Sequence, residues 1–112
     1  MNAQLVWIVV AKEQDLPDDG RLAITLGGQS ILLLRCDGQV YAIGNRCPHL
    51  GCFMTRGKLD GFILMCPCHD WTFDIRNGEF ILAKEITLPT YPVKSNMQQI
   101  YLQIHQSGES NG

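Results

Sequence analysis

The sequence lacks a long hydrophobic run and a cluster of basic residues. Its N-terminal apolar stretch, residues 5–10, is followed closely by Lys12 and Glu13, and no basic residue precedes it. This pattern predicts neither a signal peptide nor a membrane anchor. Nine basic and eleven acidic residues give a net charge of −2 without the basic patch that nucleic-acid binding requires. We therefore expect a soluble cytoplasmic protein with no nucleic-acid and no membrane partner.

Repeats, long amphipathic helical patterns and linker-like tracts are also absent before the last few residues. The chain has 112 residues, of which 46% are hydrophobic. That length is enough for one core and too short for a catalytic domain beside it. We predict a single monomeric domain over residues 1–112, with a disordered tail at residues 106–112.

Short apolar runs between turn signals predict an all-β fold. Gly27-Gly28 and Asp37-Gly38 tolerate the positive φ of tight turns, so each is expected to close a hairpin. The predicted strands are residues 5–10, 22–26, 31–36, 40–43, 62–65, 71–75, 80–82, 91–93 and 100–104.

Cysteine and histidine gather in two short segments. These are Cys47-Pro48-His49-Leu50-Gly51-Cys52 and Cys66-Pro67-Cys68-His69-Asp70-Trp71. They supply Cys-x-His, a gap of sixteen residues and Cys-x-x-His, so two facing loops between strands can enclose a metal centre. An isolated Cys or His is more often structural, but two matching pairs with Pro and Gly beside them favour metal binding. Zinc is an alternative, although zinc modules usually space paired ligands by two or more residues.

The ligand spacing resembles that of Rieske proteins, and the resemblance extends over about residues 40–95, including 71–73, 77–79 and 88–93. Within this group the chain is most similar to the stand-alone Rieske ferredoxins of bacterial multicomponent oxygenases, including aromatic-ring dioxygenases and toluene-type monooxygenases. The resemblance implies a Rieske fold: an antiparallel β-sandwich base with a small cluster-binding subdomain, about residues 45–75, formed by two ligand loops.

One [2Fe–2S] cluster is implied by the same resemblance. It assigns Cys47 and Cys66 to the inner iron, and His49 and His69 to the outer iron. With only two thiolate ligands the oxidised cluster has a formal charge of about zero, whereas a cluster with four cysteine ligands has a charge of about −2. Adding an electron is therefore less opposed by negative charge. The implied role is one-electron transfer from a flavin-containing reductase to a terminal oxygenase, through transient contacts at the His49/His69 tip.

Two other functions compete with the electron carrier. A Rieske oxygenase would need a further iron held by two histidines and a carboxylate, and His105 is the only histidine outside the ligand set. We therefore expect a chain that is not itself an enzyme. A Rieske-like small subunit of a larger reductase, such as nitrite reductase, is the remaining alternative, although such subunits commonly lack the ligands.

Cys52 and Cys68 remain inside the ligand loops. In the Rieske subunits of respiratory and photosynthetic complexes, and in some soluble relatives, cysteines at these positions form a disulfide. Many oxygenase ferredoxins lack the pair, and two free thiols are the alternative that a reducing cytoplasm favours. We expect the disulfide, because facing loops hold the two sulfurs in line.

The resemblance also identifies residues that tune the redox potential. High-potential Rieske proteins place serine and tyrosine hydroxyls where this chain has Trp71 and Phe73, and Asp70 adds a negative charge nearby. A potential in the lower part of the Rieske range is therefore expected. The segment that usually covers the cluster as a proline-containing loop corresponds to residues 82–88, which have no proline here; this predicts a cover that is differently shaped or more mobile.

Overall fold

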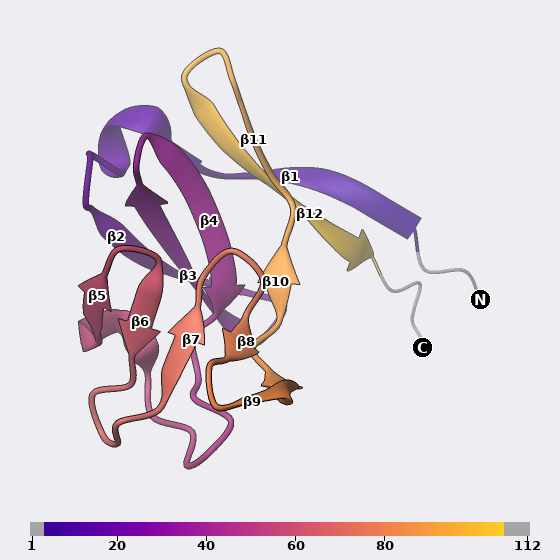
Figure 1. Cartoon of the computed structure of the whole chain (residues 1–112). Helices are drawn as coiled ribbons and strands as arrows, with labels where there is room; N and C mark the ends of the chain where they lie inside the picture. The colour runs from indigo at the N-terminus through magenta and orange to yellow at the C-terminus, as the bar shows by residue number, and fades with distance from the viewer. Residues whose placement is uncertain (1–3, 107–112) are drawn as a thin grey trace.

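The computed structural model describes residues 4–106, which form three antiparallel sheets (Figure 1). The terminal sheet has the strand order β1 (Gln4–Lys12), β12 (Gln99–Gln106) and β11 (Val93–Asn96). The central sheet has the order β10 (Thr90–Tyr91), β4 (Gln39–Gly44), β3 (Gln29–Cys36) and β2 (Arg21–Leu26). The loop sheet runs in chain order: β5 (Lys58–Asp60), β6 (Ile63–Met65), β7 (Thr72–Asp74), β8 (Glu79–Phe80) and β9 (Ala83–Thr87).

Two short 3₁₀ turns, η1 (Glu13–Asp15) and η2 (Met54–Arg56), are the remaining regular elements between residues 4 and 106. The predicted all-β fold with antiparallel sheets is confirmed. No helix in this part of the chain is long and apolar enough to cross a membrane.

Strand β3 lies between two hydrophobic cores. Side chains alternate across a strand, so its continuous apolar run divides between two faces. Ile31 and Leu33 pack in the same core as Leu102 of the terminal sheet. Leu32 and Leu34 face the other core, which includes most of the buried residues of the loop sheet and of the ligand loops. The central sheet therefore lies between the terminal sheet on one side and the loop sheet with the two ligand loops on the other.

Both predicted hairpin turns are present. The two residues of the first turn, Gly27 and Gly28, have φ of 59° and 81°, and those of the second, Asp37 and Gly38, have φ of 55° and 79°. Paired strands follow from each: β2 pairs with β3, and β3 pairs with β4. These turns are local features, which explains why the sequence reveals them.

Two expectations need correction. The tail was expected to begin at Gln106, but this residue still belongs to β12, and residues 107–112 lie outside the described part. His105, expected beyond the last strand, is within β12 opposite Leu5. The cover segment at residues 82–88, expected to differ from the usual proline-containing loop, is largely strand β9, which turns back after Phe80 and pairs with β8. The short β5 was not predicted.

Candidate metal centre

The first ligand loop leaves β4 and closes on itself before η2. The backbone N–H of Cys47 donates to the carbonyl of Cys52 at 2.8 Å, and Gly51 N–H donates back to the Cys47 carbonyl at 2.7 Å. Gly51 has φ of 77°, a conformation that costs glycine little. The Arg46 guanidinium donates to the Gly51 carbonyl at 3.2 Å and covers the Phe53 ring at 4.4 Å. Backbone hydrogen bonds within the first ligand loop and the Arg46 side chain therefore hold this loop closed.

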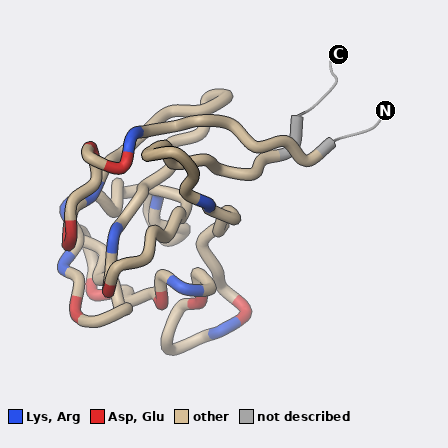
Figure 2. Tube along the Cα trace, turned by 90° about the horizontal axis from the view of Figure 1, so that it is seen from above, with Lys and Arg blue, Asp and Glu red and all other residues tan. Residues whose placement is uncertain are grey.

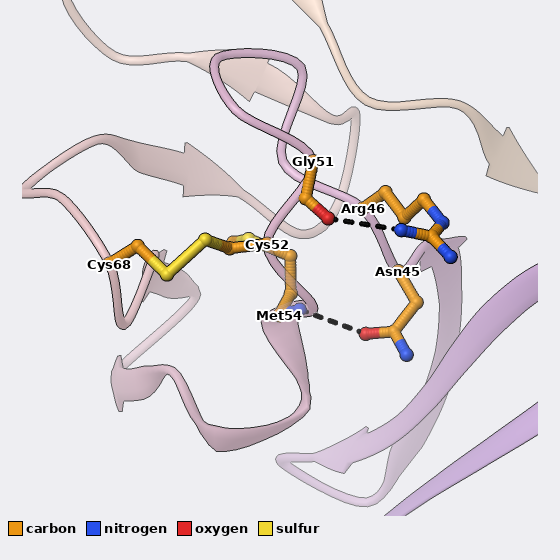
Figure 3. Close-up of a disulfide and its surroundings, with 6 residues drawn as sticks. All are labelled: Asn45, Arg46, Gly51, Cys52, Met54 and Cys68. Atoms are coloured by element: carbon orange, nitrogen blue, oxygen red, sulfur yellow. Dashed lines mark hydrogen bonds between the residues drawn. A yellow bond between two sulfur atoms is a disulfide. The ribbon is translucent and has the colours of Figure 1, made fainter.

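Asn45 anchors the base of this loop from a buried position (Figure 3). Its side-chain Oδ1 accepts from the Met54 N–H at 3.0 Å and from the Thr55 hydroxyl at 3.1 Å. Its Nδ2 donates to the Ser30 hydroxyl at 3.1 Å. The start and the end of the loop are therefore fastened to each other and to β3 by one amide group.

The second ligand loop connects β6 to β7 and closes through the Cys66 N–H, which donates to the Trp71 carbonyl at 2.8 Å. A disulfide joins Cys68 of this loop to Cys52 of the first, with their Cα atoms 6.4 Å apart (Figure 3). The expected disulfide is therefore present, and it bridges the two loops. The two segments that contain the predicted metal ligands are therefore held side by side.

The two kinds of donor lie at different depths. Cys47 and Cys66 are buried, with 1% and 2% of their surfaces exposed, whereas His49 is exposed and His69 is half-buried. The two imidazole rings meet edge to face with centroids 4.6 Å apart. The loops thus bring together a buried cysteine pair and a surface histidine pair.

Burial raises the pKa of the Cys47 thiol, and the neighbouring Cys66 thiol raises it further. Backbone N–H groups of His49 and Leu50 act in the opposite direction, because they donate hydrogen bonds to the Cys47 sulfur. A buried thiolate pair is costly without a cation, and ferric ions supply the compensating charge. The donor set fits an iron–sulfur cluster in this respect.

The donors occur as pairs. Among the side chains described, no three of His, Cys, Asp or Glu converge closely enough to hold a single metal ion. A two-iron cluster asks for two protein ligands on each iron, and the cysteine pair and the histidine pair correspond to that need. The remaining free cysteine, Cys36, is buried outside the loops, and its thiol donates to the Gly61 carbonyl at 3.3 Å.

The three residues expected to tune the potential occupy different environments. Asp70 is exposed, and Phe73 is fully buried in the core that also contains Cys47 and Cys66. The Trp71 ring lies parallel to the His49 ring, with centroids 4.4 Å apart and an interplanar angle of 5°. The face of the Trp71 indole therefore contacts His49, one of the predicted ligands.

Sequence reasoning missed Asn45, Arg46 and Phe80. Each acts through a contact with another segment or turn: Asn45 with β3 and η2, Arg46 with the loop carbonyl, and Phe80 with Trp71. The hydrogen bond from Asn45 to Ser30 joins residues 15 apart, and no local pattern in the sequence marks it.

Comparison with known families and sequences agrees with this geometry. Residues 6–92 match the family model described as the Rieske [2Fe-2S] domain. The ferredoxin component of the naphthalene 1,2-dioxygenase/salicylate 5-hydroxylase systems of Ralstonia sp is 33% identical over 101 residues, which cover 88% of this chain and 95% of that protein.

Solved structures share the fold. The ferredoxin of carbazole 1,9a-dioxygenase from Nocardioides aromaticivorans IC177 matches with a TM-score of 0.78 and 25% identity, over 86% of this chain and 95% of that chain. A reduced complex between oxygenase and ferredoxin in carbazole 1,9a-dioxygenase contains a chain that matches with a TM-score of 0.79 and 21% identity. That match covers 86% of this chain but only 27% of the chain in the complex.

Proposed function

Because the chain belongs to the Rieske [2Fe-2S] domain family, we propose that it is the ferredoxin of a multicomponent oxygenase system, taking electrons from a flavin-containing reductase and delivering them to a terminal oxygenase. One Rieske [2Fe–2S] cluster, when bound, supplies the one-electron chemistry. The observation that carries the proposal is that two loops joined by a disulfide contain two buried cysteines and two histidines whose rings are in contact, one exposed and one half-buried.

The cluster-binding part is residues 45–75 of a single domain. Cys47 and Cys66 are the ligands of the inner iron, and His49 and His69 are those of the outer iron. Burial supports the cysteine assignment, since thiolate charge on this side is compensated by iron, and exposure supports the histidine assignment. The closed loops and the disulfide between them also support the assignment, because they keep the two ligand loops together.

The histidine tip is where redox partners make contact. His49 is exposed, and the neighbouring Leu50 has 64% of its surface exposed, so an apolar side chain lies next to the ligand. Figure 2 shows basic and acidic residues interspersed along the trace, without a long run of one sign. Short-range contact at the tip is therefore favoured over long-range electrostatic steering.

The redox potential lies in the lower part of the Rieske range of roughly −150 to +300 mV. Phe73 places a ring without a hydroxyl in the cysteine-containing core, and Trp71 presents its ring face to His49. Neither contact donates a hydrogen bond to a sulfur atom, so the reduced state is not stabilised in that way. Such a potential suits a carrier that accepts electrons from a flavin.

The small subunit of a larger reductase is the weaker candidate. The Ralstonia relative, of which the aligned region covers 95%, is a ferredoxin component. All four predicted ligands are also present in this chain, at the end of the molecule where a partner can reach the histidines.

The test is EPR spectroscopy of the purified protein before and after dithionite reduction, with iron, sulfide and zinc analysis. A Rieske signal is expected only after reduction, with two irons and two sulfides per chain. Alanine variants of Cys47, His49, Cys66 and His69 should each lose the signal and the iron. Cys36→Ala and His105→Ala are matched controls outside the loops and should retain both. A colourless or zinc-containing protein would refute the proposal.

A further inference from the structure

His49 is the end member of a column of three aromatic rings. Its ring lies parallel to Trp71, with centroids 4.4 Å apart and an angle of 5°. The other stacking partner of Trp71 is Phe80, with centroids 4.3 Å apart and an angle of 10°. Stacked aromatic rings at such distances attract each other beyond the effect of their area burial. The exposed imidazole of His49 therefore packs on the face of the Trp71 indole, which is itself stacked on Phe80.

The column is anchored in the core of the protein. Phe80 is buried, and its ring contacts the fully buried Phe73 with centroids 5.5 Å apart. Trp71 itself follows the second ligand loop, and its carbonyl accepts the hydrogen bond that closes this loop. Rotation of the indole is thus restricted from the side opposite His49.

The two histidines differ in this respect. His69 meets His49 edge to face, at an interplanar angle of 66°, and within residues 4–106 it has no parallel aromatic partner. His49 is the more exposed of the two, yet its ring plane is the one fixed by stacking. Stacking therefore restrains the His49 ring at an exposed position, where the loop itself restrains a side chain least.

We propose that Trp71 is a positioning residue, which fixes the ring plane of His49 by stacking and lowers the redox potential through its ring face. The inference rests on the proposed function in one respect, that His49 is a ligand of the outer iron. It assigns to Trp71 a role that depends on a planar ring and not on the indole N–H. The role is specific to one of the two histidines.

Two physical effects of the stacked indole both lower the redox potential. The face of an indole ring carries partial negative charge, which opposes the extra electron on an iron bound to the stacked imidazole. The ring also excludes water from one face of His49, and water would stabilise the more negative reduced state. Removal of the indole should therefore raise the midpoint potential.

The experiment compares Trp71→Phe, Trp71→Leu and Trp71→Ala in the cluster-loaded protein. Phenylalanine retains a stacking ring, leucine retains apolar volume alone, and alanine retains neither. Trp7→Leu is the matched control, because Trp7 is the other tryptophan, lies on β1 and faces Lys94 at 4.5 Å. The readouts are the midpoint potential and the g values and line widths of the reduced EPR spectrum.

We expect Trp71→Phe and Trp7→Leu to match the wild type. Trp71→Leu should raise the potential and broaden the EPR lines, since the imidazole plane is no longer fixed, and Trp71→Ala should do both more strongly. Equal behaviour of the phenylalanine and leucine variants would overturn the proposal, as would loss of the cluster in Trp71→Phe. A wild-type protein without a Rieske signal would instead refute the proposed function, so the two failures are distinguishable.

Discussion

Replacing Asn45 by alanine tests whether the buried amide holds the first ligand loop. The change removes three side-chain hydrogen bonds, to Met54, Thr55 and Ser30. The Met54 N–H keeps a second acceptor, the backbone carbonyl of Asn45 at 2.7 Å, so that bond is only partly lost. At about 1 kcal/mol for each net hydrogen bond, the closed loop should lose about 2–3 kcal/mol relative to the open loop.

That loss should appear in the rate at which iron is released. If release proceeds through local opening, the open population rises tenfold for each 1.4 kcal/mol or so, which gives roughly a 30- to 150-fold faster loss. The assay is the decay of visible absorbance of the cluster-loaded protein at a fixed urea concentration and temperature. The iron and sulfide content before urea is added shows whether each variant starts fully loaded.

Ser30→Ala provides the graded control, because it removes one of the three bonds and leaves the amide in place. It should accelerate the decay about fivefold, the equivalent of about 1 kcal/mol. A decay rate for Asn45→Ala within twofold of that for Ser30→Ala would refute the idea that the amide fastens the loop as a unit.

Three further predictions concern the disulfide, the core and an ion pair. Cys52 and Cys68 enclose a loop with a sequence separation of 16; their double alanine variant should lose about 3 kcal/mol of unfolding free energy. In urea titrations a reductant should weaken the wild type and leave that variant unchanged. Phe73→Tyr should raise the midpoint potential in redox titration, because its hydroxyl enters the core that contains both ligand cysteines; a lower or unchanged potential contradicts this. The Arg76 guanidinium lowers the pKa of Asp74, so its stabilising effect is present above the usual carboxyl pKa and is lost as pH falls through the lowered value. Asp74→Asn should therefore reduce the loss of stability seen on acidification below about pH 4 in urea titrations, and an unaltered pH dependence would count against the pair.

The parts of the fold that the sequence predicted are those determined locally. Asp37 and Gly38 both have positive φ in the turn between β3 and β4, and the Asp-Gly pair in the sequence predicted this hairpin. The short β5 and the strand β9 have weak local signals, and their pairing depends on neighbours already in place. The absence of proline indicated only that the cover segment differs from the usual one, and the strand within it follows from pairing with β8.

The features of the candidate site can also be separated into those that local sequence predicts and those that require the folded structure. Cys47 and His49 are recognisable because their spacing is short and chemically specific, and the structure brings them beside the second loop. The stack between His49 and Trp71 joins residues 22 apart in the chain, and its parallel geometry depends on how both loops close. The resemblance to Rieske proteins suggested an effect of Trp71 on the potential through a missing hydroxyl, but its parallel stack on His49 is visible only in the folded structure.

Alternation along β3 gives the protein two cores that share one strand. Leu33 belongs to the core shared with the terminal sheet, and its neighbours Leu32 and Leu34 belong to the core that includes the ligand loops. Substitutions beneath the terminal sheet can thus accumulate on one face of β3 while the residues around the ligands stay unchanged on the other. The core beneath the terminal sheet can therefore be redesigned while the core around the ligand loops keeps its own packing.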